Sequence, residues 1–369
     1  MLNQVAAAFD RQDYQTAARL LRLLLQQSPN HPGVQFYAAR LHEVSGETRA
    51  AEQIYRRLLK ETTNPKVAIQ ARQGLQRLQA ATQERRQEAI AEAKSDPLNT
   101  GAAFLVLEPI SGAIRPSAVR NFARIMKLDP YTAQLHLPSR GWRLYRVDSA
   151  AEIQVYGQEL QQDGIPAFWV TLAAIAKIRV FRVLHFKTAD PQPTIVCQNE
   201  ADQLGSLTFD WSEVTRRIEG RLPIFEDVVD LDARNRLKRK EQTQDYAQIC
   251  DLHLPGRNCI LRICDTAYQF QQGIPFQPNQ PDSNQSKKVK RLQVTNRINW
   301  NNLLGFLDLH LAEIPLWADF TPFAETALDP LALVDGFNAY IGLLRKAESN
   351  WDPAFHLYSS LVFLHKKEN

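Results

Sequence analysis

The first 64 residues align with themselves at a shift of 34 positions, and this internal repeat restricts the region to a stack of similar units. In each copy an apolar helix, over 5–9 or 34–44, precedes a polar turn and a second amphipathic helix, over 14–27 or 48–60. Small residues where the helices cross would let them approach closely. The matched pairs are Ala17 with Ala51, Leu21 with Tyr55, Leu24 with Leu58, Asp13 with Glu47, and Ala8 with His42. The pattern predicts two consecutive helical hairpins.

These residues resemble the tetratricopeptide repeat (TPR) family, and the resemblance covers about the first 80 residues. The family's small residue falls on Ala17 and Ala51, and its large residue four positions later falls on Leu21 and Tyr55. The closing proline of the first copy is Pro29, whereas the second copy has Thr63 at that position. A third helix, over 67–94, is polar on one side and is predicted to cap the stack.

The resemblance implies a concave groove that binds a protein partner. First-helix positions that line this groove in the family map to Leu2, Ala6, Phe36, Arg40 and Glu43. For Phe36 an equally good interpretation is that the ring belongs to the core between the repeats. The family's clamp for chaperone carboxylates needs a basic residue and an asparagine where this chain has Leu2 and Ala6, so a chaperone C-terminus is not the expected ligand.

After a turn-rich linker at 95–101, residues 102–172 predict the order strand, helix, helix, strand, helix, strand. The expected strands are 104–107, 142–147 and 167–172, with helices at 116–126, 129–135 and from Ser149 to Gly164. This order is similar in topology to the split βαβ modules of the ribosomal stalk protein's C-terminal domain and of the Clp protease adaptor. Both of those bind proteins, but a likeness of topology alone carries little functional information.

Residues 178–369 are predicted to form a strand-rich α+β domain with a small antiparallel sheet or partial barrel. The expected strands are 178–186, 194–197, 206–211, 224–231, 247–254 and 259–264. A polar loop at 271–288 precedes helices at 300–311, 331–345 and 353–364, the last two opened by Asp329-Pro330 and Asp352-Pro353. The predicted fold class is therefore multidomain, with all-α TPR-like hairpins over 1–95, a small α+β module over 102–172 and the strand-rich domain over 178–369.

Motifs for catalysis or cofactor binding are absent from the sequence: there is no phosphate loop, dinucleotide fingerprint, nucleophile elbow or zinc-binding helix. The four cysteines form no C-x-x-C pair and are interpreted as small core hydrophobes. Asp308, His310 and Glu313 do not fall on one helical face, and His253 lacks partners at metal spacing. We therefore expect no enzyme activity, cofactor or metal, with an unrecognised enzyme in 178–369 as the alternative.

Two basic clusters favour a different partner, a nucleic acid or the ribosome. The first contains Arg234, Arg236, Lys238, Arg239 and Lys240, and the second contains Lys287, Lys288, Lys290 and Arg291. Lysine and arginine clusters of this kind contact phosphates. However, Glu226, Asp227, Asp230 and Asp232 lie just upstream and would offset the charge, and the net charge of the chain is only +4. A solvated charge run is the simpler interpretation.

Targeting signals are not evident in the sequence. The start, Met1-Leu2-Asn3-Gln4-Val5, has no basic region, and the longest apolar run, 165–176, is too short for the ~20 residues that span a bilayer. These features predict a cytoplasmic protein without a membrane span, and the glutamine-rich, lysine-poor composition is typical of a bacterial source. Taken together, the sequence predicts a non-enzymatic adaptor or scaffold that assists the assembly of a larger complex.

Overall fold

The structure, a computed structural model, describes residues 1–231, 237–276, 295–332, 334, 337–343 and 349–365. For residues 98, 227–231 and 237–241 it describes the backbone alone. The chain divides into two compact units, Met1–Glu92 and Ala93–Asn369. Helical repeats form the first unit and sheets with covering helices form the second, which confirms the predicted fold class.

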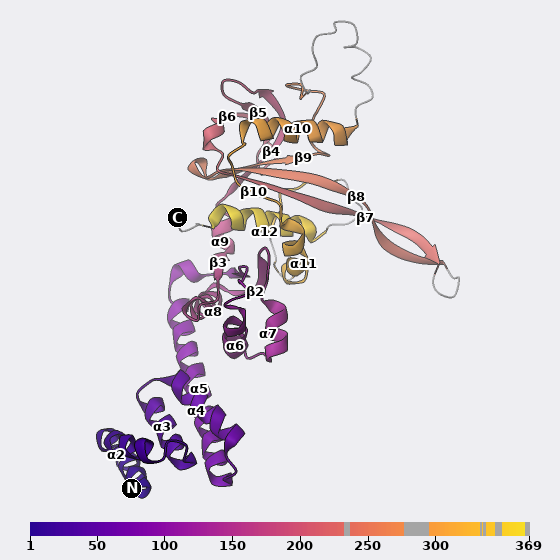
Figure 1. The fold of residues 1–369 in the computed structure, drawn as a ribbon. Coiled ribbons are helices and arrows are strands. Elements are labelled where there is room, and N and C mark those ends of the chain that lie inside the picture. Colours follow the sequence, from indigo (N-terminus) through magenta and orange to yellow (C-terminus); the bar gives the residue numbers. More distant parts are fainter. Residues whose placement is uncertain (232–236, 277–294, 333, 335–336, 344–348, 366–369) are drawn as a thin grey trace, which may run out of the picture. The chain divides into compact units, whose positions relative to one another are not determined.

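The N-terminal unit consists of antiparallel helical hairpins followed by a long helix (Figure 1). Its helices are α1 (Leu2–Asp10), α2 (Tyr14–Gln27), α3 (Pro32–Val44), α4 (Thr48–Glu61) and α5 (Pro65–Lys94). Asp13 accepts a hydrogen bond from the Thr16 N–H and so caps α2, while Pro32 occupies the first position of α3. Gly46 has φ +81° in the turn before α4, a conformation that glycine adopts without strain. Local sequence signals therefore define both hairpins.

The second unit begins with a three-stranded sheet of order β2-β1-β3, in which both pairings are antiparallel. Its elements are β1 (Ala102–Leu107), α6 (Arg115–Met126), α7 (Pro130–His136), β2 (Arg143–Ser149), α8 (Ala150–Gln162), β3 (Ala167–Thr171) and α9 (Leu172–Ile175). Since β1 is antiparallel to both neighbours, β2 and β3 are parallel to each other with β1 between them. This is the expected split βαβ arrangement. Asp129 and Ser149 cap α7 and α8 as their positions in the sequence predict.

A seven-stranded sheet of order β10-β7-β8-β9-β4-β5-β6 forms the rest of the framework. Its strands are β4 (Arg179–Thr188), β5 (Thr194–Gln198), β6 (Leu204–Thr208), β7 (Arg216–Leu231), β8 (Leu237–Leu254), β9 (Cys259–Cys264) and β10 (Leu316–Trp317). The pairings of β4 with β9 and of β10 with β7 are parallel, and the others among the described strands are antiparallel. The sheet is thus mixed rather than purely antiparallel.

Three helices follow: α10 (Asn296–His310), α11 (Phe320–Leu331) and α12 (Trp351–Leu364). The prediction of a helix over 331–345 is wrong for its described residues beyond Leu331, because Asp329 and Pro330 lie in the last turn of α11 instead of opening a helix. Apolar residues at helical spacing on the N-terminal side of Pro330 are buried and define α11. They are Phe320, Phe323, Ala324, Ala327 and Leu331.

The main core of the second unit joins both sheets through α11 and α12. Phe104 and Leu144 of the small sheet belong to the same apolar cluster as Ile218 of β7 and Phe355 of α12. Gly220 on β7 leaves room for the aromatic rings of these helices, since a Cβ atom there would lie 2.6 Å from the Phe355 ring. A second cluster packs α10 against β4, β8 and β9.

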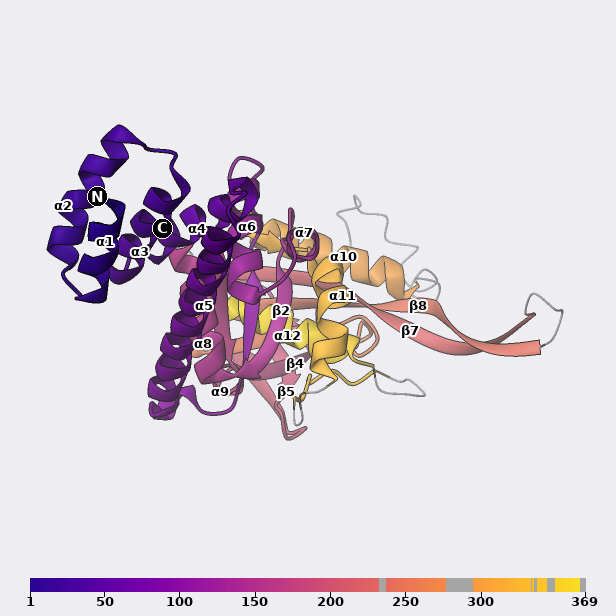
Figure 2. The same ribbon diagram turned by 90° about the horizontal axis from the view of Figure 1, so that it is seen from below.

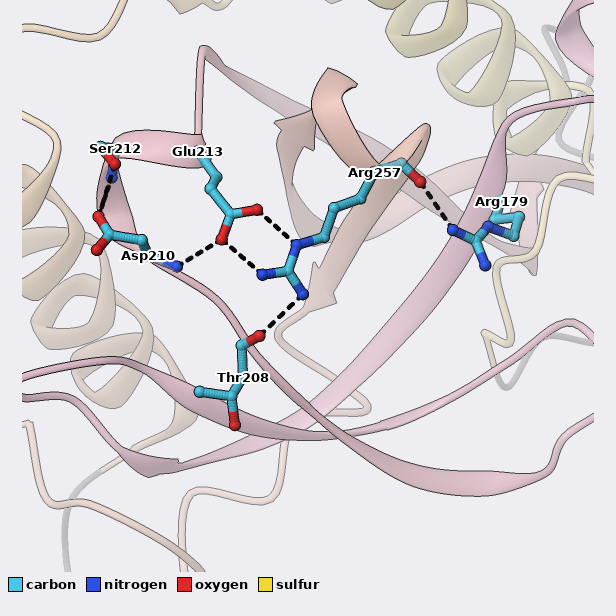
Figure 3. A network of polar contacts seen from close by, with 6 residues as sticks. All are labelled: Arg179, Thr208, Asp210, Ser212, Glu213 and Arg257. Carbon is cyan, nitrogen blue, oxygen red and sulfur yellow. Dashed lines mark hydrogen bonds and ion pairs between the residues drawn. The ribbon is translucent and has the colours of Figure 1, made fainter.

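An arginine closes the end of strand β6 (Figure 3). Arg257 lies in the η3 turn (Pro255–Arg257) and donates to both carboxylate oxygens of Glu213, at 2.5 and 2.6 Å, in the η2 turn (Trp211–Glu213). Its Nη1 donates to the Thr208 carbonyl oxygen at 2.9 Å, and its own carbonyl accepts from Arg179 at 2.8 Å. Hydrogen bonds from Arg257 and from the Asp210 N–H lower the pKa of Glu213. The network joins the η2 and η3 turns to the end of β6 and the start of β4, and the Arg257 guanidinium is occupied by these contacts.

Candidate protein-interaction face of the N-terminal unit

Glu43 on α3 and Arg77 on α5, which are 34 residues apart in the chain, contact each other in the structure. Arg77 on α5 donates to both carboxylate oxygens of Glu43 on α3, at 2.7 and 3.0 Å, and Tyr55 on α4 donates its hydroxyl to the same carboxylate at 2.6 Å. Burial opposes the charged form of Glu43, but these hydrogen bonds from Arg77 and Tyr55 hold its pKa below the usual value. Glu43 therefore joins three helices, which leaves less of it available to a partner.

Gly74 explains how the Tyr55 ring fits between the helices. A Cβ atom at Gly74 would lie 2.4 Å from the Tyr55 ring, closer than any side chain allows, and Tyr55 is fully buried. Glycine in a helix interior costs roughly 1 kcal/mol relative to alanine. The close packing of the ring gives a reason for the glycine, and the ring position in turn brings the Tyr55 hydroxyl to Glu43.

Arg40 is held less firmly by its neighbours than Arg77, which makes two hydrogen bonds to Glu43. Its Cζ atom lies 5.3 Å from the centre of the Phe9 ring, within the range of a cation–π contact. The Nε atom is buried and has no hydrogen-bond partner in the described part of the chain. The residue as a whole is half-buried, so part of it is accessible to solvent. An arginine held by stacking, with donors to spare, is suited to bind an anionic or carbonyl group.

The other predicted groove residues lie at different depths. Leu2 and Ala6 on α1 are half-buried, and Leu2 packs near Gly33 at the start of α3. Phe36 is only 5% exposed and packs in the core of α3, α4 and α5, with its ring centre 6.1 Å from that of Tyr55. Its burial fits the interpretation of Phe36 as a core residue. The sequence mapping did not include Arg77, whose side chain is 45% exposed beside Glu43 and which the 34-residue spacing could have identified.

Comparison with known families agrees with this geometry. The tetratricopeptide repeat family matches residues 8–72, which cover α2, α3 and α4 together with parts of α1 and α5. The N-terminal region is TPR-like. Repeats of this class serve protein–protein interaction, so the match indicates the same general role for this region. No curated protein and no solved structure matches the chain.

Much of the predicted nucleic-acid patch lies outside the described residues. This applies to Arg234, Arg236, Lys287, Lys288, Lys290 and Arg291. The backbone of Lys238, Arg239 and Lys240 lies on β8, where Lys238 is the register partner of Asp230 on β7. β8 pairs with β9 only over Ile249–Leu254, so the distal part of the β7–β8 hairpin reaches past the neighbouring strands (Figure 2). Of these three basic residues only Lys238 is therefore opposite an acidic residue, since Arg239 and Lys240 are the register partners of Val229 and Val228.

Candidate metal ligands of the second unit have other partners. The Asp308 carboxylate accepts from Arg217 at 2.7 Å, and the Nε2 atom of His253 lies 3.0 Å from the Ser359 hydroxyl. All four cysteines are free and buried, and burial raises the pKa of Cys259 to about 11. Across the described residues, no group of three or more histidine, cysteine, aspartate or glutamate side chains could hold a metal ion.

A cavity of about 610 Å³ lies between β2 and the end of α11. Its volume is in the range of small-molecule sites. Val147, Leu172 and Pro330 contribute apolar lining, and the Asp148 carboxylate beside them is ion-paired with Arg146 at 2.5 Å. The described lining contains no serine, cysteine, histidine or lysine, and its ionisable side chains are Tyr145, Arg146, Asp148 and Asp329. Among the described helices, none is long and apolar enough to cross a membrane.

Proposed function

We propose that the chain is a non-enzymatic adaptor or scaffold that recruits a protein partner through its N-terminal unit and assists the assembly of a larger complex. The match of the tetratricopeptide repeat family to residues 8–72 carries this proposal. Two cations, Arg77 and Arg40, lie near the single carboxylate of Glu43, and of these Arg77 holds the carboxylate while Arg40 stacks on Phe9 of α1. The partner segment would therefore offer a carboxylate or a row of carbonyl groups to Arg40, with apolar contacts near Leu2 and Ala6.

The first test replaces Arg40, the half-buried cation of this face. In Arg40→Glu the stacking on Phe9 is removed and the charge is inverted, so partner binding by the full chain is expected to fall about tenfold or more, as for a central charged anchor. Recovery of partners from native lysate, treated with nuclease and quantified by mass spectrometry, measures the decrease. The matched control is Arg22→Glu, an exposed arginine on α2, which is expected to bind normally. Equal recovery by both variants would contradict the proposal.

Nucleic-acid binding is a second candidate, favoured by the position of the basic run on a protruding two-stranded ribbon. Such ribbons enter the grooves of duplexes. If this function operates, the triple change Lys238→Glu, Arg239→Glu and Lys240→Glu should weaken binding to a duplex RNA or DNA probe at low salt. The slope of log affinity against log salt should also decrease by roughly 0.9 for each phosphate that the variant no longer neutralises. A salt-insensitive interaction, or one that the triple variant leaves unchanged, excludes this candidate.

A further inference from the structure

Three large apolar side chains are exposed around α6 and α7 in the second unit. Tyr131 and Leu135 lie one turn apart on α7 and are 73% and 59% exposed, and Ile114, just before α6, is 43% exposed. Arg115, the next residue, donates to the Leu137 carbonyl oxygen at 2.8 Å, which brings the start of α6 to the end of α7. The three apolar side chains therefore belong to one region of the surface, and exposed patches of this kind mark interaction sites.

Two arginines border these side chains, and neither has a carboxylate partner among the described residues. Besides Leu137, Arg115 bonds the carbonyl oxygen of Gln134 at 3.3 Å, and Arg143 donates to the carbonyl oxygen of Leu135 at 2.9 Å. Carbonyl groups hold the guanidinium groups in place but leave their positive charge uncancelled. In addition to burial, the charge of Arg143 lowers the pKa of the nearby His136. The surface at the end of α7 is thus both apolar and positively charged.

The α7 face is defined by Ile114, Arg115, Tyr131, Leu135 and Arg143. We propose that it docks an acidic, amphipathic segment of a protein partner. Carboxylates of this segment would contact the two arginines, which already hold their orientation through backbone carbonyls, so little side-chain entropy is lost on binding. Apolar side chains of the segment would cover the isoleucine, tyrosine and leucine of the face.

The aliphatic members of the α7 face favour a protein over a nucleic acid. A phosphate backbone gains from the arginines and a base can stack on a tyrosine, but neither benefits from covering exposed isoleucine and leucine. An amphipathic segment can contact the arginines, the tyrosine and the aliphatic side chains of the face together. Apolar anchors one helical turn apart on that segment would match the spacing of Tyr131 and Leu135. This face lies in the second unit, so the inference does not depend on the TPR-like region.

The test uses the full chain and a random peptide display library, followed by titration of synthetic copies of the selected peptides. The patch variant combines Tyr131→Gln and Leu135→Gln, two exposed positions where the fold should be unaffected, and Arg140→Glu changes the charge of an exposed residue on the segment that joins α7 to Arg143 of the face. Leu309→Gln is the control, because Leu309 is 82% exposed on α10. Parallel titrations use single-stranded RNA and vesicles that contain an anionic phospholipid.

We expect peptides rich in aspartate, glutamate and apolar residues, whose affinity falls about tenfold or more in the patch variant and decreases with salt. Arg140→Glu should weaken the same peptides, and Leu309→Gln should not. Selected peptides without acidic bias, or equal binding by the patch variant and the control, would overturn the proposal. RNA or vesicles that bind in place of peptides, and no longer bind the patch variant, would also overturn it and assign the face to that ligand.

Discussion

Replacing Asp251 with alanine is expected to lower the free energy of unfolding of the second unit by about 3–5 kcal/mol, the usual cost of breaking a buried ion pair. Asp251 on β8 and Arg262 on β9 are directly opposite in register and almost completely buried. Arg262 donates to both carboxylate oxygens, at 2.9 and 2.6 Å, and Ser359 of α12 donates to one of them at 2.6 Å. Without the carboxylate, the guanidinium would remain buried with no counter-charge.

Tryptophan fluorescence in urea measures this effect in the second unit alone, since all six tryptophans lie beyond residue 92. Asp245→Ala is the control on the same strand, at an exposed position where a change of less than about 0.5 kcal/mol is expected. A double variant, Asp251→Leu with Arg262→Met, should recover much of the stability because it removes both buried charges. If Asp251→Ala unfolds at the same urea concentration as Asp245→Ala, the ion pair is not a major support of the core.

Elements set by local patterns were predictable from the sequence. The hairpins of the N-terminal unit and the order of the small α+β module follow from apolar spacing and caps such as Asp129 and Ser149, which act within a few residues. The Asp251 network was not predictable, because Ser359 is 108 residues away in the chain. The segment at 329–330 shows the ambiguity of one signal. Aspartate followed by proline is common at a helix start, but here the buried stripe before it extends the preceding helix.

The sequence could predict which residues lie in the candidate site, but not which of them contact one another. The resemblance to the TPR family placed Arg40 and Glu43 in the predicted groove, yet only the structure shows that Arg77 and Tyr55 occupy the Glu43 carboxylate. The space that Gly74 leaves for the Tyr55 ring depends on the approach of α4 to α5, which pattern analysis does not measure. Sequence spacing therefore identifies which side chains share a face, and packing decides which of them stay free.

Acidification from pH 7 to pH 5 is expected to destabilise the second unit through two buried histidines. His253 on β8 and His356 on α12 are almost fully buried. Burial, together with the charge of Arg262 and for His253 also that of Arg216, lowers the pKa of both well below the usual value. Their native forms are therefore neutral. Because the Ser359 hydroxyl donates to Asp251, it must accept from His253, which leaves the buried Nδ1 atom of His253 without a partner among the described residues.

The direction of the pH effect follows from proton binding. In the unfolded chain both histidines titrate near pH 6.5, so below that pH the unfolded state binds protons that the native state does not. The histidine contribution is complete above pH 6.5 and is lost as pH falls, at up to about 1.4 kcal/mol per pH unit for each residue. Asp265, whose pKa is raised by burial, acts in the opposite direction. Comparing variants at each pH therefore separates the histidines from other groups.

The measurement is urea unfolding by tryptophan fluorescence at intervals from pH 7 to pH 5. His356→Phe keeps a ring next to Phe337 but cannot take up a proton, so it should remove about half of the pH dependence that the two buried histidines contribute. His31→Gln, a change at an exposed position in the N-terminal unit, should leave the dependence as it is in the parent chain. A His356→Phe profile parallel to that of the parent would mean that acid reaches His356 without opening the core, and that the helix α12 is less tightly enclosed than its burial indicates.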